Sequence, residues 1–87
     1  MNSNTLMEPA LDAATGLFVL VFRTNIRYKK DIKTITLTLD QHPLISKWNV
    51  DMDDADRILR IISSESNPEE FITIIKDAGY ICEELND

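Results

Sequence analysis

Residues 28–43 read YKKDIKTITLTLDQHP, and the structure that they adopt decides the fold of this 87-residue chain. Threonines alternate with Ile35, Leu37 and Leu39, a pattern of period two that is typical of a strand. Apolar residues also recur at helical spacing at positions 32, 35 and 39, and Pro43 is a natural end for a helix. The local pattern alone does not decide between strand and helix.

The segments on either side supply the context. Residues 17–22 (LFVLVF) form an unbroken apolar run rich in β-branched and aromatic residues, which is typical of a central strand. Residues 48–53 alternate apolar and polar side chains, as expected of a half-buried strand. Residues 58–62 are again almost entirely apolar, so a second central strand and a polar hairpin turn between the two are predicted.

A second helix is predicted from residue 68 onward. Asn67 is a good N-cap, Pro68 suits the first helical position, and Glu70 has the spacing of a capping box. Apolar residues then recur at helical spacing, and Gly79 stands where a left-handed C-terminal cap is needed. A last short strand is expected over residues 80–85.

With residues 28–41 as a helix, these elements predict an α+β fold of the ferredoxin-like type. This βαββαβ sandwich has a four-stranded antiparallel sheet with two helices on one face. It places the two continuous apolar strands in the middle of the sheet, in agreement with their composition. One domain is expected, over residues 16–87. Residues 1–15 are predicted to be a flexible N-terminal tail, and whether they dock on the sheet stays open.

Composition and charge exclude several classes of protein. The net charge of −6 argues against general affinity for nucleic acid. The apolar run at residues 17–22 is far too short to cross a membrane. Cys82 is the only cysteine, which excludes an internal disulfide. Because no basic and apolar leader is recognised, a cytoplasmic location is expected.

Four stretches carry a resemblance to a known family. Residues 67–72 (NPEEFI) and 76–80 (KDAGY) are similar to the final helix and the Ala-Gly-Tyr ending of the heavy-metal-associated domain, the domain of copper chaperones. Residues 42–45 (HPLI) and 48–51 (WNVD) resemble the exit of its first helix and its second strand. The resemblance covers nearly all of the chain beyond the tail, and it implies the same ferredoxin-like fold.

The family's metal motif, Gly-Met-x-Cys-x-x-Cys, is missing. Counting back from the proline at position 43 places Asn25 and Ile26 at the Gly-Met positions, and Tyr28 and Asp31 at the two cysteine positions. Ile26 preserves an apolar anchor, but neither Tyr28 nor Asp31 replaces a thiolate for a soft metal ion. Copper-chaperone activity is therefore not carried over, and no metal or cofactor is expected. We interpret Tyr28 as a packing plug over the vacated position.

The same loop holds the strongest basic cluster of this acidic chain, with five basic residues and only Asp31 as an acid between positions 23 and 33. Arg27, Lys29 and Lys30 are candidates to bind a small anion or an acidic partner surface, because the start of a helix attracts negative charge. The alternative interpretation is a solvated basic patch in which Asp31 helps to cap the helix.

The remaining polar residues indicate neither catalysis nor a metal site. A calcium loop that began at Asp51 would need glycine at its sixth position and glutamate at its twelfth, where Asp56 and Ile62 stand, so the acidic stretch is interpreted as a turn. Cys82 is expected to be half-buried on the last strand, and His42 to end the first helix, where a histidine suits the helix dipole. No catalytic triad, phosphate-binding glycine loop or carboxylate pair is recognised, so an enzyme is not expected.

The sequence therefore predicts a non-enzymatic interaction or regulatory module whose protein partner it does not identify. Both faces of the strand at residues 17–22 are apolar, so a sheet covered by helices on one face exposes apolar side chains on the other. That surface suits a homodimer, or burial by the N-terminal tail. A small-anion or metabolite sensor that uses the basic loop is an alternative. A metal binder with oxygen ligands, or with Cys82 across a dimer, is another.

Overall fold

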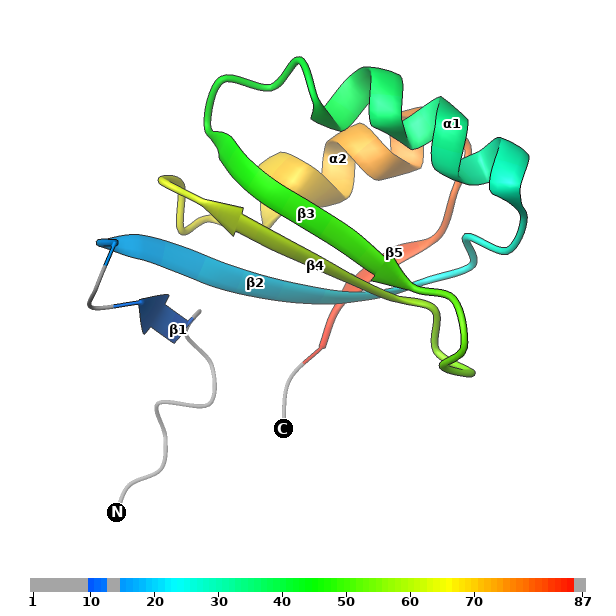
Figure 1. Cartoon of the computed structure of the whole chain (residues 1–87), viewed down its shortest axis with the longest axis horizontal. Coiled ribbons are helices and arrows are strands. Elements are labelled where there is room, and N and C mark those ends of the chain that lie inside the picture. The colour runs from blue at the N-terminus through cyan, green and yellow to red at the C-terminus, as the bar shows by residue number, and fades with distance from the viewer. Residues whose placement is uncertain (1–9, 13–14, 86–87) are drawn as a thin grey trace.

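Figure 1 shows the computed structural model, which describes residues 10–12 and 15–85. Two helices lie on one side of an antiparallel sheet, so the predicted α+β class is confirmed. The elements in chain order are β1 (Ala10–Asp12), β2 (Leu17–Thr24), α1 (Lys29–Leu39), β3 (Ile45–Asp51), β4 (Ile58–Ser63), α2 (Glu69–Asp77) and β5 (Cys82–Glu84). In this described part of the chain, neither helix is long and apolar enough to cross a membrane.

Strand β2 is the centre of the sheet. On one side it pairs with β4, and β3 pairs with the far side of β4 to form an outer edge. On its other side β2 pairs with β1 near its start, where Val19 opposes Ala10, and with β5 near its end, where Arg23 opposes Glu83. Each of these pairings is antiparallel. The first and last strands therefore share one edge of β2.

The stretch that decides the fold is a helix, as the order of the neighbouring segments predicted. Its helical stripe places Ile35 and Leu39 in the core, where both are fully buried, whereas Leu37 is 68% exposed. The alternation of threonine and apolar residues was therefore misleading. The hydroxyl groups of Thr34 and Thr36 donate to carbonyl oxygens one turn back, at 3.1 and 2.6 Å, and so fit within the helix.

Three strands differ most from the prediction, while β2 and β4 only extend by one or two residues beyond it. Residues 10–12, inside the predicted tail, form β1 at the edge of the sheet, so this part of the segment does dock. The rest of that prediction, at residues 1–9 and 13–14, lies outside the described residues. Strand β3 begins at Ile45, three residues earlier than expected, and β5 is shorter than the predicted strand at 80–85.

The core fills the space between the sheet and the two helices. Alternate residues of β2 and β4 point toward the helices, as the pleat of a strand requires. The largest side chains that are fully buried in it are Phe22, Phe71, Ile26, Ile35, Leu39, Leu59, Ile61 and Ile75. Cys82 on β5 belongs to the same cluster and is 1% exposed, so the expectation of a half-buried residue was wrong.

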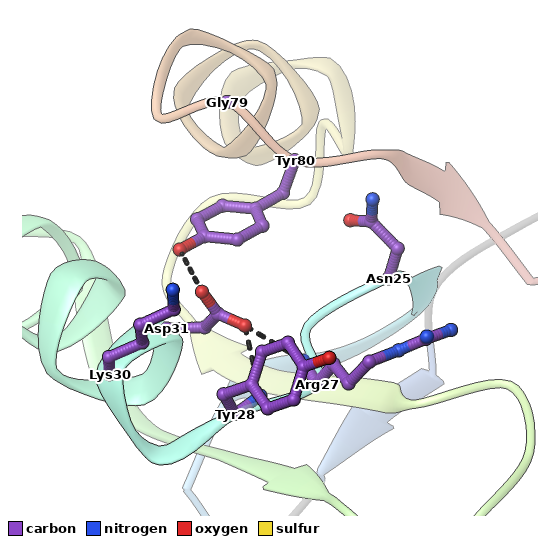
Figure 2. A pocket seen from close by; sticks show the side chains of 7 residues that line it. All are labelled: Asn25, Arg27, Tyr28, Lys30, Asp31, Gly79 and Tyr80. Carbon is purple, nitrogen blue, oxygen red and sulfur yellow. Dashed lines mark hydrogen bonds between the residues drawn. The ribbon is translucent and has the colours of Figure 1, made fainter.

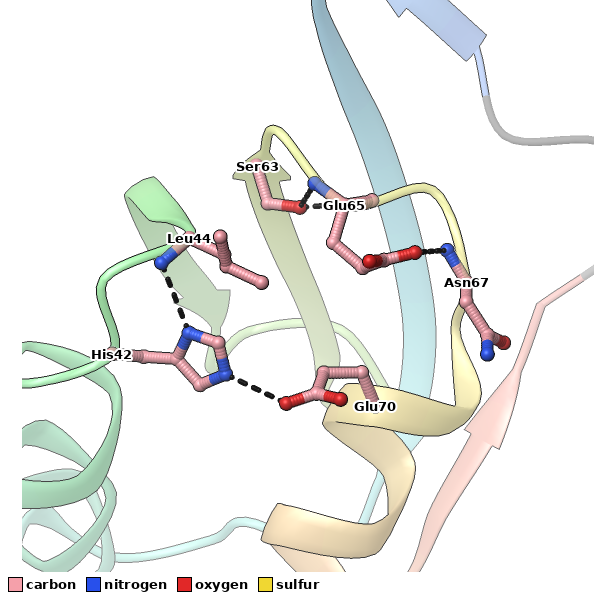
Figure 3. Close-up of polar contacts among 6 residues, drawn as sticks. All are labelled: His42, Leu44, Ser63, Glu65, Asn67 and Glu70. Atoms are coloured by element: carbon pink, nitrogen blue, oxygen red, sulfur yellow. Dashed lines mark hydrogen bonds and ion pairs between the residues drawn. The ribbon is translucent and has the colours of Figure 1, made fainter.

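His42 joins the loop after α1 to the first turn of α2 (Figure 3). Its Nδ1 accepts the N–H of Leu44 at 3.1 Å, and its Nε2 lies 3.1 Å from a carboxylate oxygen of Glu70. Because Nδ1 accepts, the ring proton belongs on Nε2, which donates to Glu70. The ring also packs on Phe71, with 5.3 Å between the ring centres. His42 is therefore structural, and it contacts the first turn of α2 as well as the loop that follows α1.

The turn before α2 uses partners that differ from the prediction (Figure 3). Asn67 does cap, because its Oδ1 accepts the N–H of Glu69 at 3.1 Å. The predicted capping box is wrong: Glu70 reaches His42, and the N–H of Asn67 instead donates to Glu65 Oε2 at 2.8 Å. The hydroxyl of buried Ser63 bonds both the carbonyl and the N–H of Glu65, at 2.6 and 2.9 Å. Short-range side-chain contacts thus close this turn.

Candidate functional site

A pocket of about 450 Å³ lies where the β2–α1 loop meets the α2–β5 loop. We call it the tyrosine pocket. Its lining residues are Asn25, Arg27, Tyr28, Lys30, Asp31, Gly79 and Tyr80, all drawn in Figure 2. The structure therefore brings together Tyr28 and Asp31, which the resemblance aligned with the two missing cysteines, and two of the three basic candidates, Arg27 and Lys30. The third candidate, Lys29, does not line the pocket.

The first loop is shaped by the residues beneath it. The side chain of Ile26 is fully buried, as the apolar-anchor prediction required. The hydroxyl of Thr24 donates to the carbonyl of Arg57 at 2.6 Å and accepts the N–H of Ile26 at 3.2 Å. Because the side chains of Thr24 and Ile26 are buried, Asn25 and Arg27, on either side of Ile26, are exposed and line the pocket.

The second loop begins at the predicted left-handed cap. Gly79 has a φ of +101°, a conformation that favours glycine, and it ends α2 as predicted. The N–H of Tyr80 then donates to the carbonyl of Ile75 at 3.2 Å, which closes the helix end. The next N–H, of Ile81, donates to Asn25 Oδ1 at 2.9 Å. This last bond ties the two loops together across the pocket.

The carboxylate of Asp31 is the centre of the pocket's polar contacts (Figure 2). Its Oδ2 accepts the backbone N–H groups of Tyr28, at 2.9 Å, and Arg27, at 3.1 Å. Its Oδ1 accepts the hydroxyl of Tyr80 at 2.8 Å. The expectation that Asp31 helps to cap α1 is confirmed. In addition, the carboxylate joins α1 to a residue 49 positions away in the sequence.

These contacts fix the charge state of the pair. The backbone N–H of Tyr28 and the hydroxyl of Tyr80 both hold the pKa of Asp31 below its ordinary value, with smaller contributions from the N–H of Arg27 and the charge of Lys30. Burial raises the pKa of Tyr80, and so does its hydrogen bond to the carboxylate. At neutral pH the pair therefore consists of an ionised Asp31 and a protonated Tyr80.

The Asp31 network gives a pH prediction. Because its folded-state pKa is lowered, Asp31 stabilises the fold above its unfolded-state pKa, and this contribution is lost as pH falls through the folded-state value. We expect an NMR titration to place the pKa of Asp31 below 3.8, its ordinary value. Tyr80→Phe removes one donor and raises that pKa. Tyr28→Phe, the matched control, leaves it unchanged, since the bond from residue 28 comes from its backbone. Equal shifts in both variants would contradict the assigned network.

Tyr28 does not act as the predicted packing plug. Its side chain is 57% exposed, and it forms an outer wall of the pocket instead of filling it. The ammonium of Lys30 lies 5.6 Å from the centre of its ring, within the range of a cation–π contact. The Asp31 network lies beside this ring, and the space next to that network remains open as the pocket.

Outside the pocket, the acidic turn and Cys82 are held by their surroundings in the described part of the chain. The described residues contain no group of three or more His, Cys, Asp or Glu side chains that could hold a metal ion. The acidic turn is closed by its own carboxylates, since Asp51 and Asp54 accept the N–H groups of Asp53 and Asp56. Cys82 is buried, and burial raises the pKa of its thiol to about 12, so it is not a ready nucleophile.

Sequence reasoning missed two lining residues as parts of a site. Tyr80 was noted only as part of the Ala-Gly-Tyr ending, and Asn25 only as a loop position. The signal available in the sequence was the type of residue: an Asn in a loop commonly bonds a backbone group, and a partly buried Tyr needs a partner for its hydroxyl. Which partner each would find depends on the meeting of two distant segments: Asn25 bonds Ile81, 56 positions away, and Tyr80 bonds Asp31, 49 positions away.

A second surface of interest is the side of the sheet away from the helices, which we call the open face. Val19, Val21 and Ile62 are half-buried there, because their neighbours in each strand point toward the helices. Arg60 is exposed on the central strand β4, opposite Val21 on β2 and Asn49 on β3. Within the described ranges, no carboxylate lies within ion-pair distance of Arg60.

Comparisons with protein-family models, with curated proteins and with solved structures find no match to the chain. The resemblance to heavy-metal-associated domains therefore stays a prediction. The tyrosine pocket and the open face are therefore defined by their own geometry and charge.

Proposed function

We propose that the chain is a non-enzymatic interaction module whose open face binds an acidic partner protein. We further propose that its fold is a ferredoxin-like sandwich of the heavy-metal-associated type without soft-metal ligands. The strand order β5–β2–β4–β3, with α1 following β2 and α2 following β4, supports this fold. The presence of Tyr28 and Asp31, which are not soft ligands, supports the loss of metal binding.

Arg60 carries the proposal for the open face. Arg60 lies in the middle of the sheet, with Val21 beside it and Val19 and Ile62 close by. The N–H donors of its guanidinium have no carboxylate partner in the described part of the chain, and they lie next to an apolar patch. Arginine surrounded by apolar surface is common among the residues that dominate protein interfaces. A partner carboxylate would form a bidentate pair with this guanidinium while aliphatic side chains cover the valines.

Charge favours an acidic partner over a second copy of the chain. Lys47 is also exposed on the open face, where it opposes Ile62, and it too has no carboxylate within ion-pair distance in the described part. Arg23 on the same face is already paired with Glu83 at 2.7 Å. A face-to-face homodimer would bring Arg60 and Lys47 of both copies into one interface, where like charges repel each other.

The proposal is tested by site-specific photo-crosslinking in the native host, followed by reconstitution. A benzophenone amino acid replaces Asn49, which lies beside Arg60 on the open face, or Thr73, which is exposed on α2, as the control. We expect a discrete adduct from position 49 and none of that mass from position 73. With the purified partner, Arg60→Glu is expected to lower affinity by about tenfold or more, as for a charged interface pair. Reversing the facing carboxylate on the partner should restore it.

Other outcomes would overturn the proposal in distinct ways. An adduct between two copies of the chain, with a dimer in sedimentation, would replace the acidic partner by a homodimer. Equal adducts from positions 49 and 73 would mean that the open face has no special role. An Arg60→Glu variant that binds the purified partner as well as the parent chain does would mean that Arg60 forms no ion pair with the partner. Because Arg60 is exposed, we expect this substitution to preserve the fold.

A further inference from the structure

The hydrogen-bond acceptors that line the tyrosine pocket are largely occupied. Both oxygens of Asp31 bind donors from the protein itself: Oδ1 the hydroxyl of Tyr80, and Oδ2 two backbone N–H groups. The side-chain oxygen of Asn25 accepts the N–H of Ile81. A ligand in the pocket therefore meets few free acceptors, and a cationic or donor-rich molecule has little to bind.

The groups that remain are donors. They are the guanidinium of Arg27, the ammonium of Lys30, the amide NH₂ of Asn25 and the hydroxyl of Tyr28. Within the described residues, neither Arg27 nor Lys30 has a carboxylate within ion-pair distance, and the side-chain donors of both have no hydrogen-bond acceptor. In Figure 2 these two cations flank the ring of Tyr28. The pocket therefore favours an anionic, acceptor-rich ligand.

We propose that the tyrosine pocket binds a small organic carboxylate that carries an apolar or aromatic body. The volume of about 450 Å³ falls within the range of small-molecule sites. The rings of Tyr28 and Tyr80 supply flat apolar surface for the body of such a molecule. This inference goes beyond the proposed interaction module, since it uses different residues from those of the open face.

The balance of charge indicates a carboxylate in preference to a phosphate. Two cations, Arg27 and Lys30, and one ionised carboxylate, Asp31, line the pocket, which leaves a single positive charge. One carboxylate neutralises it, and the planar fork of an arginine matches a carboxylate in a bidentate pair. A dianion would leave excess negative charge beside Asp31. The start of α1 adds no free donor at Arg27 or Tyr28, because Asp31 already binds both N–H groups. Recognition therefore rests on side chains.

The test is a titration of the ¹⁵N-labelled chain with benzoate, acetate and inorganic phosphate, followed by amide chemical shifts. We expect benzoate to give saturable shifts centred on residues 25–31 and 79–81. Acetate should bind more weakly, because it lacks a body that contacts the tyrosine rings. Tyr28→Leu should reduce this preference for benzoate over acetate while preserving the fold, since the residue is 57% exposed.

Charge variants separate the pocket from the general basic character of the loop. Arg27→Gln and Lys30→Gln should each lower the affinity for benzoate by about tenfold, in the range expected for a charged hydrogen bond. Lys33→Gln is the matched control: it removes the same charge from the same helix, is exposed, and does not line the pocket. It should leave the affinity nearly unchanged.

Each alternative result would overturn the inference. Shifts that fail to saturate, or an equal loss of affinity in Lys33→Gln, would reduce the effect to diffuse attraction by the basic loop. Phosphate binding at least as tight as that of benzoate would contradict the assigned ligand class. Because none of these variants touches the open face, a failure here leaves the crosslinking test of the proposed function standing, and the reverse also holds.

Discussion

Replacing Phe71 by alanine is expected to lower the free energy of unfolding by about 3–5 kcal/mol, the usual cost of removing a buried aromatic side chain. Phe71 is fully buried on α2, and its ring packs on His42 as well as within the main core. A small domain has only about 5–15 kcal/mol of stability in total. The substitution therefore removes a large part of it, and the melting temperature should fall by roughly 15 °C or more.

Two matched variants give this prediction its control. Phe18→Ala removes the same side chain from the start of β2, where it is only half-buried, and should cost clearly less. Leu37→Ala, at a residue that is 68% exposed on α1, should change stability by less than about 0.5 kcal/mol. The measurement is urea unfolding followed by circular dichroism. Equal losses for Phe71 and Phe18 would mean that α2 does not pack on the sheet as described.

The second large effect concerns the thiol of Cys82. Burial raises its pKa to about 12, compared with an ordinary value of 9.0, because the charged thiolate is poorly solvated inside the core. At pH 8 the folded chain therefore holds about a thousandfold less thiolate than the unfolded chain, and thiolate is the reactive species. With the side chain 1% exposed, we expect an aromatic disulfide reagent to modify the native chain at least a thousandfold more slowly than the chain in guanidinium.

The same experiment reports on the closure of β5. That strand is short and pairs with β2 through only three residues, so its detachment would expose the thiol. A native rate within tenfold of the unfolded rate would show that β5 opens frequently. Arg23→Gln, which removes the ion pair with Glu83 between these two strands, tests this directly. Because that pair is exposed, we expect only a small increase in the rate.

The helix at residues 29–39 shows why the order of elements predicted more than the local pattern did. Its threonines and apolar residues alternate as in a strand, its apolar residues also recur at helical spacing, and the position of the segment among the predicted strands decided for a helix. Burial explains the outcome: the helical stripe buries Ile35 and Leu39, whereas a strand would have placed all of Ile35, Leu37 and Leu39 on one face. Ile26 and Gly79 were equally predictable, because each depends on a local requirement of burial or backbone conformation.

The contacts that shape the site were not predictable in the same way. Tyr80 and Asp31 are 49 residues apart, and His42 and Glu70 are 28 apart. Local spacing suggested nearer roles for two of these residues, a capping box for Glu70 and the end of the first helix for His42. The partners were decided by which loops the sheet brings together. Sequence reasoning therefore found the basic loop at residues 27–30 but not the second wall that turns it into a pocket.

The pairing of the last strand, β5, with β2 has a consequence for the order of folding. Joining Arg23 to Glu83 closes a segment of sixty residues. Long loops close late in folding, because the conformational entropy lost on closing them is offset only after their contacts have formed. Tyr80 reaches Asp31 only from the turn just before β5, so the tyrosine pocket is completed with the last strand. A molecule bound there would select the fully closed chain over every partly folded form, and would slow the release of its C-terminal end.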